Sequence, residues 1–408
     1  MPAKPYDLIV FGATGFTGRL VAEYLFANYG TDGKVRWAIA GRHAARLAQV
    51  RAAIGADERL PLLLADANDA DALAALVHQA RVVATTVGPY QLHGEPLVRA
   101  CAQSGTDYVD LCGEPAWMAR MIPLYTETAH RTGARITFSC GFDSLPFDLG
   151  VVYLQHEAQR RLGAPLTGVR ARVRVMKGGP SGGTIASLLA TVEAMQRDPQ
   201  AARLMADPFA LVPGLKGAAA QPDGDTAAYD TDAKAWTGPF VMAPINTKNV
   251  HRTHALLGHP WGLGFTYDER MLTGDGDHGE RIARGLVKQA RIQNALLGFG
   301  PTRALLRRFA LPKPGEGPSR EQRERGRYEI VFSGETADRR QLRAIVKGDR
   351  DPGYGSTCKL MTETALCLAS DIPRTRTPGG VWTAGAAMGM TLVQRLHARA
   401  GLSFSIEE

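Results

Sequence analysis

The sequence is poor in cysteine and contains no long apolar run. Its five cysteines are odd in number, and none belongs to a CxxC pair or to a Cys/His cluster with ligand spacing. We therefore expect a reducing compartment and no bound metal. The longest uncharged stretch, residues 377–394, holds four glycines and a proline, so it does not predict a membrane-spanning helix. The N-terminus leads directly into an apolar strand pattern without the features of a signal peptide, which favours a cytoplasmic protein.

What is present is the composition of a globular protein. Over 408 residues, 45% are hydrophobic and 22% are charged, which excludes wholesale disorder and allows two or three domains. The net charge of +8 is uneven, because residues 301–350 hold 13 Lys and Arg against 7 Asp and Glu. Such a segment is typical of a solvated surface or of a contact with an anionic partner. It lacks interleaved aromatic residues, so we expect no nucleic-acid partner.

The first 150 residues alternate short apolar strands with helical segments. Six strands are expected in this region, with helices between them. They lie at residues 8–11, 35–40, 62–65, 82–87, 108–111 and 136–139. Alternation of this kind predicts βαβ units and therefore a doubly wound parallel sheet, covered by helices on both faces.

The pattern changes from about residue 165. Residues 169–175 alternate apolar and basic side chains, and residues 328–335 and 341–347 resemble a hairpin pair of the same kind. A period of two predicts strands of an antiparallel sheet, and the alternating arginines Arg170, Arg172 and Arg174 are most simply one solvated face of it.

The predicted fold class is thus α/β, in three parts. Residues 1–150 form a doubly wound dinucleotide-binding domain, and residues 151–352 form an α+β domain on a largely antiparallel sheet, which we expect to bind substrate and to dimerise. Residues 353–408 are expected to be helical and to pack back on the first domain.

A glycine-rich turn lies between the first strand and the first helix. It reads G-x-x-G-x-x-G, and a turn of this kind lets backbone N–H groups approach a pyrophosphate at a helix N-terminus. The spacing is a variant of G-x-G-x-x-G. We expect the turn to bind a dinucleotide in a Rossmann-type domain, through Gly12, Thr14, Gly15, Phe16, Thr17 and Gly18.

The end of the second strand discriminates between cofactors. An NAD site normally offers Asp or Glu here for the ribose 2′-hydroxyl, whereas an arginine accommodates the 2′-phosphate of NADP. This chain reads Ala40-Gly41-Arg42 with no acidic residue nearby. We therefore predict NADP(H) as cofactor, with Arg42 on the phosphate. The alternative is that Arg42 lies in a solvated loop.

Three further strand ends point to the same crevice, because ligands of open α/β sheets bind at the carboxyl ends of the strands. Val87, Gly88 and Pro89 follow the fourth strand, where we expect the nicotinamide ribose. Asp66 follows the third strand, where adenine contacts are usual. The sixth strand ends in Cys140-Gly141-Phe142-Asp143-Ser144-Leu145-Pro146. There Cys140, Asp143 and Ser144 would border the nicotinamide end, and Gly141 and Phe142 are expected to bind the cofactor. Asp143 and Ser144 are equally typical of a helix N-cap.

These segments resemble the saccharopine dehydrogenase-like oxidoreductase family, and within it the trans-acting enoyl reductases. The resemblance covers nearly the whole chain. It extends to Ser181–Thr184, Pro314–Pro318, Gly353-Tyr354, Thr362–Ala369 and Gly379–Thr383. It implies an N-terminal Rossmann domain, NADP and a reductase-type second domain. Members of this branch are thought to reduce double bonds of polyketide-derived lipids, and their catalytic residues are not well fixed.

A reductase of conjugated double bonds needs a polarising group for the carbonyl oxygen and a proton donor for the enolate. Asp143, Tyr354 and Lys359 are the catalytic candidates, and Tyr354 in its glycine-flanked turn is expected to present an exposed phenol. Two alternatives stay open: a saccharopine-reductase-like enzyme acting on an amino-acid imine, which would need converging arginines, and a non-catalytic NADP-binding protein associated with lipid.

Residues 296–311 combine leucines and Phe309 with Arg303, Arg307 and Arg308. This pattern is typical of a helix at a membrane interface and equally of a helix packed on the core. The family resemblance implies a lipid or polyketide-like substrate, and we also expect a homodimer. For this segment, peripheral membrane contact is one interpretation, and core packing or a dimer contact are the alternatives.

Overall fold

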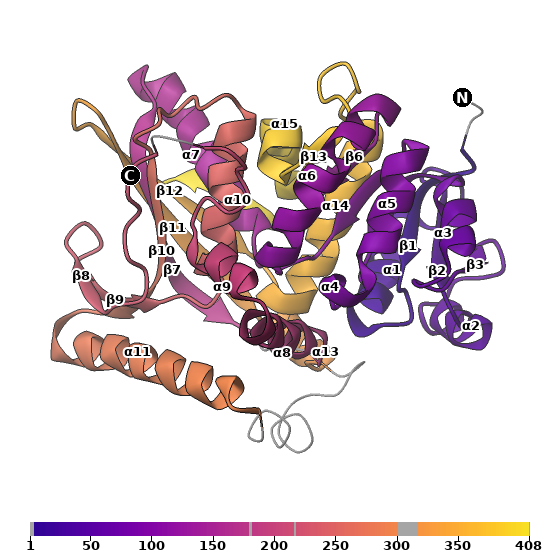
Figure 1. Cartoon of the computed structure of the whole chain (residues 1–408), viewed down its shortest axis with the longest axis horizontal. Helices are drawn as coiled ribbons and strands as arrows, with labels where there is room; N and C mark the ends of the chain where they lie inside the picture. The colour runs from indigo at the N-terminus through magenta and orange to yellow at the C-terminus, as the bar shows by residue number, and fades with distance from the viewer. Residues whose placement is uncertain (1–3, 179–181, 216–217, 301–316, 408) are drawn as a thin grey trace.

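The structure, a computed structural model, describes residues 4–178, 182–215, 218–300 and 317–407. Two seven-stranded sheets lie side by side, and the helices α14 (Thr357–Ser370) and α15 (Ala384–Arg399) lie between them (Figure 1). Residues 6–137 supply six strands of the first sheet, as expected.

The first sheet is parallel throughout, with the order β13-β6-β5-β4-β1-β2-β3. Its central strands are buried because helices cover both faces, which confirms the doubly wound prediction. Its strands are β1 (Tyr6–Phe11), β2 (Trp37–Gly41), β3 (Leu62–Leu64), β4 (Ala80–Thr85), β5 (Asp107–Asp110), β6 (Arg135–Thr137) and β13 (Gly380–Trp382).

The helices of this half connect successive strands, and α7 leads out of the first sheet into the second. They are α1 (Phe16–Tyr29), α2 (Ala44–Ala53), α3 (Ala70–Val77), α4 (Tyr90–His93), α5 (Glu95–Ser104), α6 (Pro115–Thr132) and α7 (Leu145–Leu162).

The second sheet is mixed, with the order β14-β12-β11-β7-β10-β9-β8. All its pairs are antiparallel except that of β7 with β10, so the expected largely antiparallel sheet is confirmed. Its strands are β7 (Leu166–Lys177), β8 (Ala228–Asp230), β9 (Ala235–Pro239), β10 (Thr266–Gly274), β11 (Arg327–Thr336), β12 (Gln341–Gly348) and β14 (Leu402–Ile406). The helices of this half are α8 (Gly182–Arg197), α9 (Pro199–Ala206), α10 (Ala243–Leu256), α11 (Gly276–Gly298) and α13 (Arg320–Arg325).

The arginines of β7 do not form one solvated face, and that expectation is wrong for Arg172. Arg172 is 5% exposed, and its guanidinium lies 2.6 Å from Asp230 and 3.0 Å from Asp268. Both acids come from distant strands that only the folded sheet brings to β7. Burial of a charge is tolerated because these carboxylates neutralise it.

The C-terminal segment contributes to both sheets. Strand β13 extends the first sheet beside β6, and β14 extends the second beside β12. The division at residues 150 and 352 stays a prediction, and α7 runs across the first of these boundaries. The sequence carries no strand signal at β13, because a three-residue segment that begins with a glycine is too short to show periodicity.

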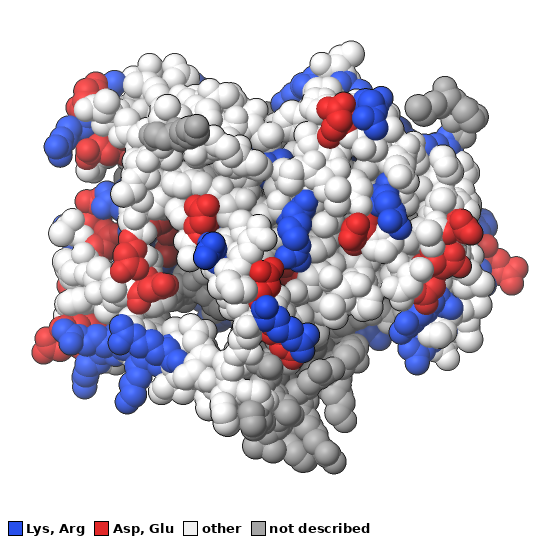
Figure 2. Space-filling view, viewed as in Figure 1, with Lys and Arg blue, Asp and Glu red and all other residues white. Residues whose placement is uncertain are grey.

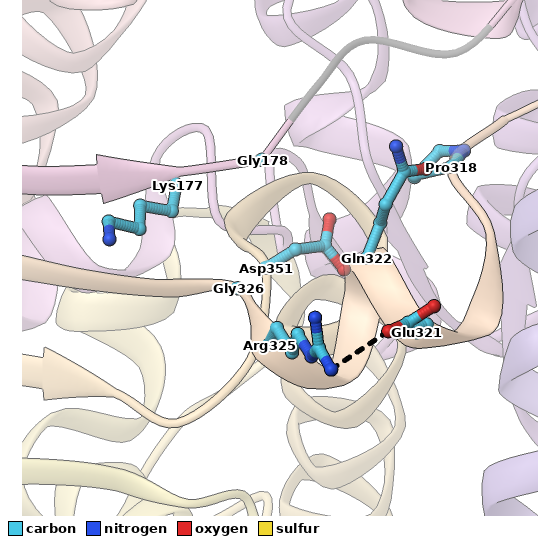
Figure 3. Close-up of a pocket in the computed structure, with 8 residues that line it drawn as sticks. All are labelled: Lys177, Gly178, Pro318, Glu321, Gln322, Arg325, Gly326 and Asp351. Atoms are coloured by element: carbon cyan, nitrogen blue, oxygen red, sulfur yellow. Dashed lines mark ion pairs between the residues drawn. The ribbon is translucent and has the colours of Figure 1, made fainter.

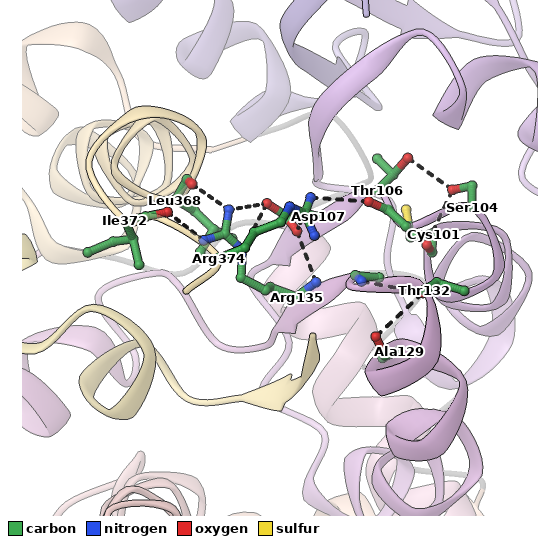
Figure 4. A network of polar contacts seen from close by, with 12 residues as sticks. Cys101, Ser104, Thr106, Asp107, Ala129, Thr132, Arg135, Leu368, Ile372 and Arg374 are labelled. Carbon is green, nitrogen blue, oxygen red and sulfur yellow. Dashed lines mark hydrogen bonds and ion pairs between the residues drawn. The ribbon is translucent and has the colours of Figure 1, made fainter. Parts of the chain in front are cut away.

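A buried charge network holds α14 against the first sheet (Figure 4). The Arg135 guanidinium binds Asp107, at the start of β5, and donates to the carbonyl oxygens of Leu368 and Ile372 at 2.7 and 2.8 Å. Arg374 lies 3.2 Å from the same carboxylate. This network lies at the amino ends of the strands and leaves the carboxyl ends to the functional site.

Candidate functional site

The glycine turn after β1 is shaped by close backbone contacts. Gly12 has a φ of +88°, which favours glycine, and its N–H donates to the Ala40 carbonyl at 3.0 Å. A Cβ on Gly18 would lie 2.3 Å from the Gly12 oxygen, so no side chain fits there. A Cβ on Gly15 would lie 3.3 Å from the same oxygen, with no other neighbour within 4 Å. Gly18 is thus required by the fold, whereas Gly15 leaves space open for a ligand.

Helix α1 begins at Phe16 with its first turn uncapped. The N-cap is Gly15, no side chain accepts a hydrogen bond from the first turn, and that turn holds no acidic residue. The N–H groups of the first turn, to which Thr17 and Gly18 belong, can therefore donate hydrogen bonds to a pyrophosphate, which the helix dipole also favours. The methyl group of Thr14 borders the end of β2 at Gly41, beside this position.

Arg42 lies where β2 ends, as predicted. Its side chain is exposed, and no acidic residue within the described part of the chain pairs with it. A guanidinium held at this strand end suits the 2′-phosphate of NADP. Asp66, after β3, is half-buried, and its Oδ1 accepts the N–H of Asn68 at 2.9 Å, which shapes the turn there.

The segment after β4 packs directly on the glycine turn. The hydroxyl of Thr86 donates to the Gly12 oxygen at 3.2 Å, and a Cβ on Gly12 would lie 2.7 Å from a Val87 methyl group. Gly88 is exposed and Pro89 is half-buried. The structure therefore brings the predicted residues of two strand ends to one edge.

Glu114 is a buried residue of this edge that the sequence analysis missed. It lies four residues after β5, is 2% exposed, and accepts the N–H groups of Tyr90 and Gln91 at 2.9 and 2.8 Å. Burial raises the pKa of its carboxyl, while these bonds and one from Ser187 of α8 act in the opposite direction. Glu114 thus fixes the segment after Pro89. A lone glutamate in a loop gives no sequence signal for such a role.

The Cys140–Pro146 segment lies at the junction of the two sheets. The Phe142 N–H donates to the Thr357 hydroxyl at 3.0 Å, and the Phe142 ring lies 4.5 Å from that of Tyr328. Gly141 is buried against Thr357 as well. Ser144 is the N-cap of α7, but it makes no capping hydrogen bond. Burial raises the pKa of the Asp143 carboxyl to about 6.

Tyr354 is not the exposed phenol that was expected. It lies in a π-helical turn, η1 (Pro352–Ser356), and is 3% exposed. Asp351 accepts its N–H at 3.0 Å, its hydroxyl lies 2.8 Å from that of Thr184, and its ring packs on Phe16 at 5.1 Å. The flanking glycines suggested a solvated turn, but contacts with α1 and α8 enclose the ring. Tyr354 is therefore next to the cofactor turn.

Lys359 lies two residues into α14, and its Nζ is 2.9 Å from both carboxylate oxygens of Asp349. This ion pair links α14 to the end of β12. Among the described residues, no hydrogen bond or ion pair joins Lys359 to Asp143.

A pocket of about 610 Å³ opens beside the η1 turn (Figure 3). The end of β7, the helix α13 and Asp351 form its walls, and an ion pair of 2.9 Å joins Arg325 to Glu321. The adjoining segment reaches the cofactor turn, because the Arg323 guanidinium lies 5.7 Å from the centre of the Phe16 ring. The lining residues are Lys177, Gly178, Pro318, Glu321, Gln322, Arg325, Gly326 and Asp351.

No cluster of three or more metal-ligating side chains is found among the described residues. His251 and His254 are both buried, and burial lowers their pKa to about 3 and about 4. The His254 ring stacks on Trp261 at 4.7 Å. Of the helices that the structure describes, none combines the length and apolar character needed to cross a bilayer. The expected interfacial segment 296–311 lies outside the described residues from position 301 onward.

Comparison with known proteins agrees with this geometry. Residues 8–136 match the saccharopine dehydrogenase NADP binding domain family. A Mycobacterium tuberculosis protein, named provisionally as a trans-acting enoyl reductase, is 42% identical over 99% of this chain and 98% of its own length. The trans-acting enoyl reductase of Mycobacterium bovis is 38% identical over 96% of both chains.

The fold is similar to that of apo saccharopine dehydrogenase (L-Glu forming) from Saccharomyces cerevisiae. The TM-score is 0.54 at 13% identity, covering 99% of this chain and 100% of that one. The uncapped helix, the open space at Gly15 and the arginine at the end of β2 fit NADP(H) as the cofactor. The chain therefore belongs to the saccharopine dehydrogenase-like oxidoreductases, in the trans-acting enoyl reductase branch, and is an NADP-dependent oxidoreductase.

Proposed function

We propose that the protein reduces a carbonyl-conjugated carbon–carbon double bond of a lipid or polyketide-type acyl substrate. The observation that carries this proposal is the near full-length similarity to relatives named trans-acting enoyl reductases. NADPH, when bound, supplies the hydride. The chain itself has to orient the substrate, polarise its carbonyl oxygen and protonate the resulting enolate.

The charges of the second sheet favour an acyl substrate over an amino-acid imine. An imine formed from glutamate carries several carboxylates, so its site needs arginines free to bind them. Each of the three candidates on β7 already has acidic partners: Asp232 for Arg170, Asp230 and Asp268 for Arg172, and Glu329 and Glu407 for Arg174. These arginines are therefore occupied by the protein's own carboxylates.

Tyr354 is the group we propose as proton donor. Its ring packs on Phe16 of the cofactor turn, and its hydroxyl is oriented by Thr184 at 2.8 Å. A buried phenol placed in this way can donate to an oxyanion without competition from water. Asp143 is the second candidate, because a carboxyl with a pKa near 6 is partly protonated at neutral pH. Lys359, bound to Asp349, is the weakest of the three.

The remaining cofactor contacts are part of the proposal. Arg42 binds the 2′-phosphate, the glycine turn binds the pyrophosphate, and Asp66 borders the adenine. Val87, Gly88 and Pro89 border the nicotinamide ribose, with Gly141 and Phe142 behind the ring. The proposal also includes a homodimer formed through the second domain, which size-exclusion chromatography with light scattering tests.

The decisive experiment follows NADPH oxidation by the purified protein. We expect turnover with a 2-enoyl thioester and none with the matched saturated thioester. Turnover with glutamate and an aldehyde instead would assign the imine reaction. Tight NADPH binding without turnover of either substrate would favour the non-catalytic alternative.

A further inference from the structure

Helix α11 has one face on the second sheet and the other in solvent. Only Gly279 and Ala283 of this 23-residue helix are buried. A Cβ on Gly238 of β9 would lie 3.0 Å from Leu286 and 3.3 Å from the Ala283 oxygen, so these residues mark the side that contacts the sheet. In Figure 1 the helix runs along the lower edge of the molecule. Its opposite side therefore faces outward.

The outward side carries a row of basic residues. Arg281, Arg284, Lys288 and Arg291 follow each other at intervals of three and four, which places them on one line of a helix over about 15 Å. Arg284 pairs with Glu280 at 2.5 Å. Within the described residues, the other three have no acidic partner. Figure 2 shows the basic side chains projecting from this edge.

Two exposed isoleucines lie beside the basic row. Ile282 is 40% exposed and Ile292 is 48% exposed, although isoleucine side chains are usually buried. At 100° per residue, both fall between the basic row and the side that contacts β9. Apolar and cationic side chains thus share the outward surface of one long helix.

We infer that this surface, defined by Arg281, Ile282, Lys288, Arg291 and Ile292, docks the protein on an anionic lipid membrane. Unpaired cations attract acidic headgroups, and the isoleucines can enter the acyl boundary. The four basic residues span about 15 Å on one side of a helix at the edge of the molecule, which suits an extended anionic surface. This inference deepens the proposed function, because it names the surface from which a lipid substrate would be drawn.

The test is co-sedimentation of the full chain with phosphatidylcholine vesicles, with and without phosphatidylglycerol. We expect binding to the anionic vesicles, weakened by salt, and little to the neutral ones. The double substitution Lys288→Glu with Arg291→Glu should lower binding about tenfold or more. The matched control, Arg99→Glu with Arg131→Glu, changes the net charge equally on exposed residues of α5 and α6 and should keep binding.

A second variant tests the two exposed isoleucines. Ile282→Ser with Ile292→Ser should lower binding to anionic vesicles several-fold while the basic row is kept. Absence of wild-type binding at low salt, or equal loss in the two charge variants, would overturn the inference. A third outcome would overturn the inference in favour of a protein partner. In that outcome the wild type does not bind vesicles, and the charge variant of α11 loses turnover on a substrate carried by an acidic protein. NADPH oxidation with a soluble enoyl thioester should be unchanged in these variants, so failure of docking and failure of the proposed function remain distinguishable.

Discussion

The two sheets of the protein place their charged residues differently. In the first sheet, the buried pair of Asp107 and Arg135 lies at the amino ends of β5 and β6, and the proposed site residues lie in turns at the carboxyl ends of the strands. The second sheet carries charge within its strands, where Arg172 and Arg270 are buried with Asp268 between them. The comparison teaches that a cofactor site can be encoded by a short local segment, whereas the second sheet depends on partners far apart in the chain.

The first test concerns Tyr354, whose ring packs on Phe16 of the cofactor turn. Tyr354→Phe should lower kcat about 100-fold to 10,000-fold, because proton transfer in the proposed reaction would lose its donor. NADPH affinity should change little. Steady-state kinetics and cofactor titration measure the two effects. Full activity of the folded variant would contradict the role and return Asp143 to first place.

The second sheet should be sensitive to loss of its buried cation. Arg172→Met leaves Asp230 and Asp268 without that partner and should lower the free energy of unfolding by about 3–5 kcal/mol. The control is Arg170→Met on the same strand, where the ion pair with Asp232 is partly exposed. This control should lower the free energy of unfolding by about 1 kcal/mol or less. Chemical denaturation measures both values. A similar loss of unfolding free energy in the two variants would mean that burial of the arginine does not determine its contribution to stability.

In the first sheet, a substitution in the glycine turn should affect cofactor binding and leave the fold intact. Gly15→Val should weaken NADPH about 100-fold or more, because the side chain excludes the pyrophosphate from charge-assisted hydrogen bonds. The fold should survive, since Gly15 has only one close neighbour. Gly18→Val is the contrasting variant and should fail to fold, because its Cβ would overlap the Gly12 oxygen. Isothermal titration measures NADPH binding, and circular dichroism measures folding. Unchanged NADPH affinity of the Gly15→Val variant would mean that the glycine turn does not bind the cofactor.

The smallest expected effect is on cofactor choice. Arg42→Ala should weaken NADPH by about 1–3 kcal/mol and leave NADH nearly unchanged, because only NADPH has the 2′-phosphate. Affinity for both cofactors is measured by titration. Equal weakening of the two would argue against the phosphate contact.

The success of the sequence analysis differs between the same two regions. Gly12 to Gly18 and Arg42 could be predicted as cofactor contacts because strand, turn and helix follow each other within some forty residues, and strand ends of a parallel sheet meet at one edge. Tyr354 was predicted as a catalytic candidate, but its exposure was predicted wrongly, because the residues that enclose it, Phe16 and Thr184, are distant in the chain. Glu114 was missed for the same reason.

By itself, the sequence determined the parallel sheet, the dinucleotide turn and the strands of β11 and β12, since each rests on local periodicity or on a motif. Only the tertiary structure decided that Arg172 is buried, that β13 joins β6, and that the phenol of Tyr354 lies against the cofactor turn. The physical reason is that burial and pairing of a charge depend on which distant segment supplies its partner. That choice is made by the packing of the two sheets around α14 and α15.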